Sequence, residues 1–171
     1  EYLVLGLVKC GGLDDAIGVF DQLSFHTVIS WTAVISGYID SYKTMEAIKL
    51  FERMIEEEVQ PNQYTYVSLI KACGTINNVE KGRELHKTVC EKGLWNAFVA
   101  SALVSMYGKC EAINEAEDVF VNLPRRDSIS WNALLTAYVE QGQAKKAMHL
   151  YRQMCEEDVS VNRNTLVFAL Q

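Results

Sequence analysis

The chain has 171 residues, 49% of them apolar, and a formal net charge of −6 at pH 7. Its two prolines and ten glycines exclude a disordered chain and a Gly- and Pro-rich β-sandwich, and it has enough apolar residues for a continuous core. No apolar run approaches the ~18 residues of a membrane-spanning helix, so we expect no membrane association. Five cysteines without Cys-x-x-Cys spacing predict buried thiols in a reducing compartment rather than a metal site or disulfides.

The predicted elements are helices that occur in pairs. From Trp31 onward, apolar residues follow the i, i+3, i+4, i+7 spacing of one helical face. After "IDSYKT" the same spacing returns, and it stops at "EEEVQPN", where proline does not easily continue a helix. Two helices joined by a short turn form an αα-hairpin. The pattern recurs along the chain, so the sequence predicts an all-α protein of nine or ten helices without strands.

The hairpins repeat at an offset of one hundred residues. "ISWTAVISGYI" at 29–39 matches "ISWNALLTAYV" at 129–139, and no gap is needed to align the flanking residues. Copied units of this kind stack into a solenoid. We expect a partial repeat at 1–27, complete repeats at 28–62, 63–96, 97–127 and 128–162, and the start of another at 163–171. Repeats of 35, 34 and 31 residues together make the hundred-residue period.

A small residue is expected wherever two helices of the stack cross closely. One early site in each second helix meets this condition, and its occupants are Ala16, Ala47, Gly82, Ala116 and Ala147. A small side chain there allows two helix backbones to approach, and a bulky replacement would cost about 1–3 kcal/mol. His86 lies where the other repeats have Phe or Tyr, so we expect it to be packed in the core.

The cycling repeat lengths and the motifs "SWNALLTAYV", "YGKC", "LIKACG" and "VFVNLPRRD" resemble the plant pentatricopeptide repeat (PPR) proteins, specifically their PLS subclass. The resemblance covers the whole chain and implies a right-handed αα-superhelix of helix-turn-helix repeats. It makes 1–27 a partial S repeat, 28–62 a P repeat, 63–96 an L repeat, 97–127 an S repeat and 128–162 a P repeat.

The resemblance also implies a function. The chain would be a sequence-specific single-stranded RNA-binding module of an organellar RNA-processing factor, which recognises sites of C-to-U editing in a transcript of the mitochondrion or chloroplast. Editing-complex proteins would be further partners. Either organelle, and roles in cleavage, splicing or stabilisation of a transcript, stay open. The alternative is a tetratricopeptide-like scaffold for protein–protein interaction, whose repeats keep a steadier 34-residue length.

In the family, the fifth and last residues of each repeat read one base, as helical RNA-binding repeats do. The resemblance assigns this role to Thr32 with Asn62, Val67 with Asn96, Ser101 with Asp127, and Asn132 with Asn162. The family's pattern then gives adenine, any base, guanine and a pyrimidine, since Val67 cannot hydrogen-bond a base. The bases would be sandwiched by the apolar second residues, Ile29, Tyr64, Phe98 and Ile129. From the residues alone, these four could instead cover the core, and Asp127 could simply cap the next helix.

The net charge of −6 counts against RNA binding, but few charged residues fall in the first helices. Basic residues near the starts of two second helices are either phosphate contacts or part of a solvated charged face: Lys81, Arg83, Lys87, Lys145 and Lys146. A zinc deaminase would need His-x-Glu followed by Cys-x-x-Cys, and the sequence has neither. We therefore expect no catalytic residues, metal, cofactor or small-molecule substrate here, and we assign any editing chemistry to a further domain or a partner.

Overall fold

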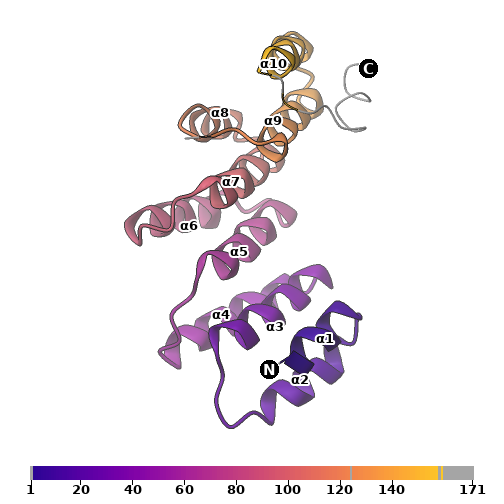
Figure 1. Ribbon diagram of the computed structural model, residues 1–171, viewed down its shortest axis with the longest axis vertical. Helices are drawn as coiled ribbons and strands as arrows, with labels where there is room; N and C mark the ends of the chain where they lie inside the picture. The colour runs from indigo at the N-terminus through magenta and orange to yellow at the C-terminus, as the bar shows by residue number, and fades with distance from the viewer. Residues whose placement is uncertain (1, 124, 158, 160–171) are drawn as a thin grey trace. The chain divides into compact units, whose positions relative to one another are not determined.

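The computed structural model describes residues 2–123, 125–157 and 159, and its regular structure over these residues is helical throughout (Figure 1). Over the same residues, ten α-helices follow one another: α1 (Tyr2–Lys9), α2 (Leu13–Asp21), α3 (Val28–Asp40), α4 (Thr44–Glu56), α5 (Gln63–Thr75), α6 (Val79–Glu91), α7 (Ala97–Lys109), α8 (Ile113–Val121), α9 (Ser128–Glu140) and α10 (Ala144–Glu156). None of these helices is long and apolar enough to cross a membrane. The expected all-α fold is confirmed.

The helix lengths explain why the expected repeats differ in length. The first helices α3, α5, α7 and α9 have 13 residues each and begin at the residues where the four complete repeats are expected to start. The second helices α4, α6 and α10 also have 13 residues, whereas α2 and α8 have only 9. The shorter second helix therefore accounts for the 31-residue repeat at 97–127.

Each hairpin turns at one residue with a left-handed backbone. After α3 this residue is Tyr42, with φ of 59°, and after α9 it is Gly142, with φ of 68°. The N–H of Tyr42 donates to Ile39 O at 3.0 Å, and the N–H of Lys43 donates to Tyr38 O at 2.9 Å. These two bonds form a Schellman motif, which satisfies the last carbonyl groups of the helix and ends it sharply.

The chain divides into two compact units, residues 1–72 and 73–171, called here the N-terminal and C-terminal units. In the N-terminal unit, α3 packs against α1, α2 and α4. Trp31 and Ile35 of α3 are fully buried, as are Ala16 of α2 and Met54 of α4. Burial of these side chains, at roughly 1.5–3 kcal/mol for each large one, holds the hairpins together.

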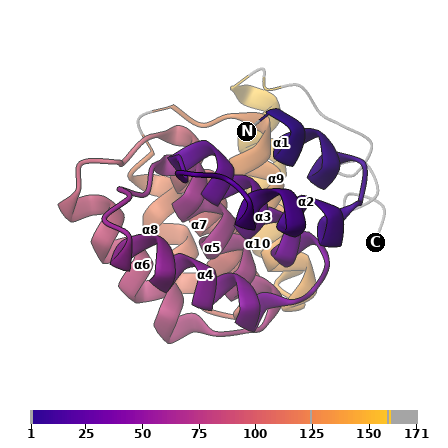
Figure 2. The same ribbon diagram turned by 90° about the horizontal axis from the view of Figure 1, so that it is seen from below.

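In the C-terminal unit, α7 packs against α6, α8 and α9, and α9 packs against α10 (Figures 1 and 2). The small-residue site of α6 shows why the crossing needs it. A Cβ atom on Gly82 would lie 2.6 Å from Sδ of Met106, a buried residue of α7. The equivalent alanines are buried as well: Ala16, Ala47, Ala116 and Ala147.

The structure corrects the prediction that the cysteines are buried, and it agrees with the packing expected for His86. Only Cys73 is buried, whereas Cys10, Cys90 and Cys155 are exposed, because they lie at a helix end or on the outward face of a second helix. His86 is packed as expected: its Nδ1 lies 3.0 Å from the hydroxyl oxygen of Tyr107, and burial lowers the pKa of His86.

Candidate nucleic-acid interface

The last residue of each repeat lies just before the first helix of the next repeat and caps it. Asn62 Oδ1 accepts from the backbone N–H groups of Tyr64 at 2.9 Å and Thr65 at 3.1 Å. Asp127 Oδ1 accepts from the N–H of Ser130 at 2.8 Å. Thr27 and Asn96 cap α3 and α7 in the same way. Short polar side chains are favoured here because they satisfy donors that the helix leaves unpaired.

Capping does not use every polar atom of Asn62 and Asp127. All the hydrogen bonds accepted by the Asp127 carboxylate go to Oδ1, and Oδ2 accepts none from the described residues. Asn62 likewise accepts through Oδ1, and its Nδ2 donates to no group in the described part of the chain. We call this arrangement a two-sided cap. Asn96 differs, because its Nδ2 donates to Leu94 O at 3.2 Å.

The fifth residues differ in their exposure and contacts. Thr32 is partly exposed, and its Oγ1 lies 2.7 Å from Oγ1 of Thr65. Ser101 is only 5% exposed, and its single hydroxyl proton is shared between Ala97 O at 2.8 Å and Asp127 Oδ1 at 3.3 Å. Ser101 is therefore nearly inaccessible to a ligand, although it contacts the carboxylate of Asp127. Val67 is buried, which agrees with leaving it out of base reading.

The pair expected in the repeat at 128–162 is described only at its fifth residue. Asn132 is partly exposed, and its Nδ2 donates to Ser128 O. Asn162 lies outside the described residues.

The four second residues form an exposed apolar set in the first turns of α3, α5, α7 and α9. The exposed fractions are 49% for Ile29, 56% for Tyr64, 44% for Phe98 and 65% for Ile129. Trp31 and Trp131, each two residues further on, are buried. The alternative in which the second residues cover the core is therefore wrong. Each of these four first helices therefore begins with one exposed apolar or aromatic side chain.

A pocket of about 240 Å³ lies between the first helices α7 and α9. Ile129 and Asn132, the second and fifth residues of the repeat at 128–162, both line it. Lys109 and Glu140 line it as well, so its formal charges balance. Two residues expected to contact RNA from one repeat thus share one cavity.

The second helices carry most of the ion pairs. Lys146 Nζ lies 2.7 Å from Glu117 Oε1, and Lys81 Nζ lies 2.8 Å from Glu84 Oε2. Arg83 pairs with both Glu80 and Glu115, and Lys87 pairs with Glu91. Of the five basic candidates, only Lys145 has no ion pair within the described residues. The pairing favours a solvated charged face over phosphate contacts.

Comparisons with known proteins agree with this geometry. A sequence profile of the PPR repeat family matches residues 26–75 and 126–169, and a profile of the PPR repeat matches 64–94. A mitochondrial pentatricopeptide repeat-containing protein of Arabidopsis thaliana is 36% identical over 159 residues, which cover 93% of this chain and 23% of that protein. A chloroplastic one of the same plant is 38% identical over 156 residues, which cover 90% and 25%. The chain thus spans about a quarter of the length of these relatives.

Solved structures share the fold at lower identity. The pentatricopeptide repeat protein PPR10, in complex with an 18-nt psaJ RNA element, superimposes with a TM-score of 0.85 at 20% identity over 95% of this chain and 25% of that chain. The PPR domain of Arabidopsis thaliana protein-only RNase P 1, in complex with tRNA, gives 0.73 at 14% identity over 98% and 93%. These matches do not favour the tetratricopeptide-like alternative. The chain belongs to the PPR repeat family.

Proposed function

We propose that the chain is a sequence-specific single-stranded RNA-binding module of an organellar factor that recognises sites of C-to-U editing. Its relatives include mitochondrial and chloroplastic proteins, and PPR10 was solved with bound RNA. The second helices α2, α4, α6 and α8 have 9, 13, 13 and 9 residues in chain order, which suits the S, P, L and S repeats of the PLS subclass. The editing reaction itself would belong to a domain outside this chain or to an editing-complex partner.

The two-sided caps give the strongest support for base recognition. Asn62 offers the donor Nδ2, which suits an acceptor such as adenine N1, and Asp127 offers the acceptor Oδ2, which suits the N1 and N2 protons of guanine. The exposed second residues supply flat or apolar surfaces on which bases stack. From the 5′ end, the expected RNA is adenine, any base, guanine and a pyrimidine.

Exchanging the two caps tests the proposal. Asp127→Asn keeps the capping Oδ1 and replaces the acceptor Oδ2 by a donor, so the third base should change from guanine toward adenine. Asn62→Asp should change the first base in the opposite direction. A good base contact is worth about 1–3 kcal/mol, or roughly 5- to 150-fold in relative affinity. The bound sequences from a randomised single-stranded RNA pool, followed by binding assays on matched RNAs, measure the change.

The fold provides the control for this exchange. Because both variants keep the helix cap, their thermal unfolding should match that of the wild type, and their binding should still weaken with salt. Identical base preferences in the wild type and both variants would contradict base reading by these residues.

A further inference from the structure

Thr65, the third residue of α5, is fully buried beside the pair formed by Thr32 and Asn62. Its Oγ1 lies 2.7 Å from Thr32 Oγ1 and 3.3 Å from Asn62 Oδ1, and the N–H of Asn62 donates to it at 3.4 Å. A threonine hydroxyl has one proton and two lone pairs. Three neighbours therefore saturate it, and the direction of each hydrogen bond can be worked out.

The amide of Asn62 fixes these directions. The atom that accepts from the backbone N–H groups of Tyr64 and Thr65 must be the amide oxygen, since the amide nitrogen carries only donors. All three contacts of Thr65 are hydrogen bonds only if its hydroxyl donates its single proton to Asn62 Oδ1, which has no proton of its own to donate. Thr32 is left to donate to Thr65, because two lone pairs would otherwise face each other across 2.7 Å.

The direction of the Thr32 hydroxyl decides what the pair offers to a ligand. With its proton committed to Thr65, Thr32 is an acceptor toward any further group, and Asn62 presents the donor Nδ2. An amino base matches this order: adenine has a 6-amino donor next to the N1 acceptor, and cytosine has a 4-amino donor next to the N3 acceptor. Guanine and uracil present the reverse order, a carbonyl acceptor next to a ring N–H.

We propose that Thr65 is a positioning residue for base specificity, which sets the hydrogen-bond polarity of Thr32 and Asn62 so that the pair selects amino bases over keto bases. This inference rests on the proposed function, in which the pair faces a base with Asn62 toward the ring nitrogen. Thr65 would not contact the RNA, since it is fully buried.

We call the hydrogen-bond chain from Thr32 through Thr65 to Asn62 the relay. The corresponding residues of α9 and α7 form no such chain. Ser130, the third residue of α9, is buried too, but its hydroxyl donates to Asp127 O at 2.9 Å. Ser101 reaches Asp127 Oδ1 directly, at 3.3 Å. The third residue of α7 is Val99, which has no hydroxyl. The relay thus belongs to the pair for which an amino base is expected.

Thr65→Val tests the proposal in the intact protein, with RNAs that differ only at the first base of the expected site. The variant keeps the shape of the side chain and releases the Thr32 proton, so Thr32 could also donate to a keto oxygen. We expect the preference for adenine over uracil and guanine to fall about fivefold or more, with little change in affinity for the adenine RNA. Thr65→Ser, which restores the hydroxyl, should restore the preference.

Ser68→Ala is the matched control. Ser68 Oγ lies 2.7 Å from Ser36 Oγ, so the variant also removes a hydroxyl pair between α3 and α5, yet it leaves Thr32 and Asn62 untouched. Its base preference should equal that of the wild type. Thr65→Ala removes the same hydroxyl as Thr65→Val with a smaller side chain, and serves as the second variant if valine prevents folding.

A double-mutant cycle with Thr32→Val separates positioning from a general structural effect. If Thr65 acts through Thr32, Thr65→Val should change base preference no further once the Thr32 hydroxyl is absent. Unchanged preference in Thr65→Val and Thr65→Ala, while the wild type discriminates, would overturn the role of Thr65 and leave the proposed function standing. A wild type without preference at the first base would instead overturn the proposed function.

Discussion

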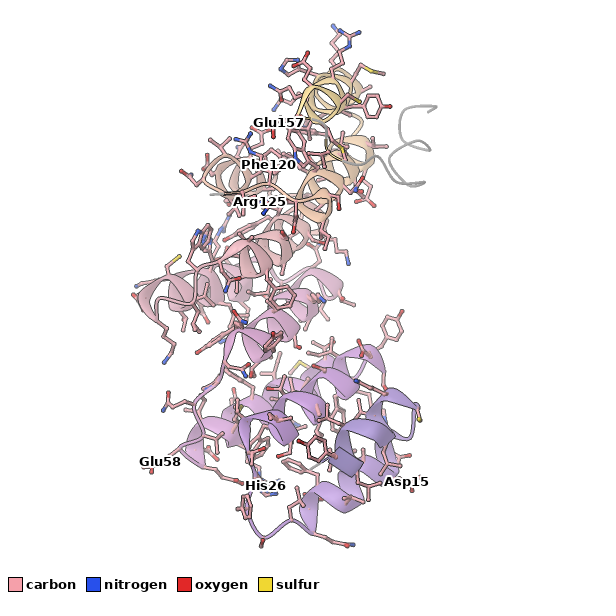
Figure 3. The ribbon with its side chains drawn as sticks, in the orientation of Figure 1. Asp15, His26, Glu58, Phe120, Arg125 and Glu157 are labelled. Atoms are coloured by element: carbon pink, nitrogen blue, oxygen red, sulfur yellow. The ribbon has the colours of Figure 1, made fainter. Side chains whose placement is uncertain are left out.

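The two copies that lie one hundred residues apart make the same contact between neighbouring hairpins with different basic side chains. In the first copy this side chain is His26, labelled in Figure 3. Its Nδ1 lies 2.9 Å from Glu57 Oε2, its Nε2 lies 3.1 Å from Phe20 O, and its ring stacks on Phe20 at 4.2 Å. The hydrogen bond with His26 is the largest influence on the pKa of Glu57 and lowers it, against the opposing effect of burial.

In the second copy, Arg126 takes the same place. Its Nη1 lies 3.1 Å from Glu157 Oε1 and its Nε lies 3.5 Å from Phe120 O, with the guanidinium 5.0 Å from the centre of the Phe120 ring. Phe120 and Glu157 are labelled in Figure 3. The guanidinium also lies 5.9 Å from the ring centre of Trp131.

The difference shows that the contact with the acid and the two rings does not depend on one basic residue at one position. The first copy has a second basic side chain, Arg53, whose guanidinium lies 5.2 Å from the ring centre of Trp31 and 2.9 Å from Glu57 Oε1. The second copy has Gln153 at the equivalent position, and Arg126 alone serves both the acid and the two rings. Each copy keeps one acid, two aromatic rings and at least one basic side chain that contacts both the acid and the rings.

Removing the tryptophan that each copy has at the same position should lower the stability most. Trp31 and Trp131 are buried and meet Phe20 and Phe120 edge to face at 4.8 and 4.9 Å. Replacement of either by alanine should lower the free energy of unfolding by about 3–5 kcal/mol, as measured by urea denaturation. Ile129→Ala, at a site 65% exposed, is the control and should change it by less than about 0.5 kcal/mol. Unequal losses in the two copies would show that the copies are not energetically equivalent.

Removing the single cation of the second copy should have an intermediate effect. Arg126→Ala loses the Glu157 ion pair, the hydrogen bond to Phe120 O and the ring contacts, so it should cost about 1–2 kcal/mol. Glu157→Gln removes only the partly exposed ion pair and should cost about 0.2–1 kcal/mol. Equal losses in the two variants would mean that the ring contacts contribute nothing.

The sequence predicted the features of this fold that depend on local signals. The first helices begin at Val28, Gln63, Ala97 and Ser128, where an apolar period of 3.6 follows a polar residue that caps the helix. The exposure of Ile129 and the cap at Asp127 could be expected only as alternatives, because a sequence pattern does not say which face of the first turn is covered.

Contacts between repeats could not be predicted from the sequence. Thr32 and Thr65 are 33 positions apart, and His26 and Glu57 are 31 positions apart, so no helical period joins them. The burial of Ser101 likewise depends on how α7 packs, since serine occurs inside and outside proteins. A hydroxyl occupies the third site of three first helices, but Ser30 and Ser130 donate to backbone carbonyl groups and only Thr65 forms the relay, so the residue type does not reveal it.

The residues at the hairpin turns, Tyr42 and Gly142, also differ between the copies, and we expect a smaller effect on stability from exchanging them. Tyr42, 84% exposed, has φ of 59° where its counterpart Gly142 has 68°. Glycine adopts this conformation without a steric penalty, so Tyr42→Gly should raise the stability by about 0.5–1 kcal/mol, and Gly142→Tyr should lower it similarly. Tyr42→Ala, which keeps a Cβ atom, is the control and should bring no such gain in thermal unfolding. A gain with alanine as large as with glycine would point to the tyrosine ring instead.

The smallest effect concerns the exchange of basic side chains between the copies. His26→Arg alone would place two guanidinium groups beside Glu57, since Arg53 already pairs with it, and should lower the stability by about 0.5 kcal/mol. Adding Arg53→Gln recreates the arrangement of the second copy and should recover that loss, because one guanidinium then serves both the acid and the rings. Urea denaturation of the two single variants and the double variant measures the coupling. If the two changes in stability simply add, the basic side chains at positions 26 and 53 act independently, and the shared contact inferred from the comparison is wrong.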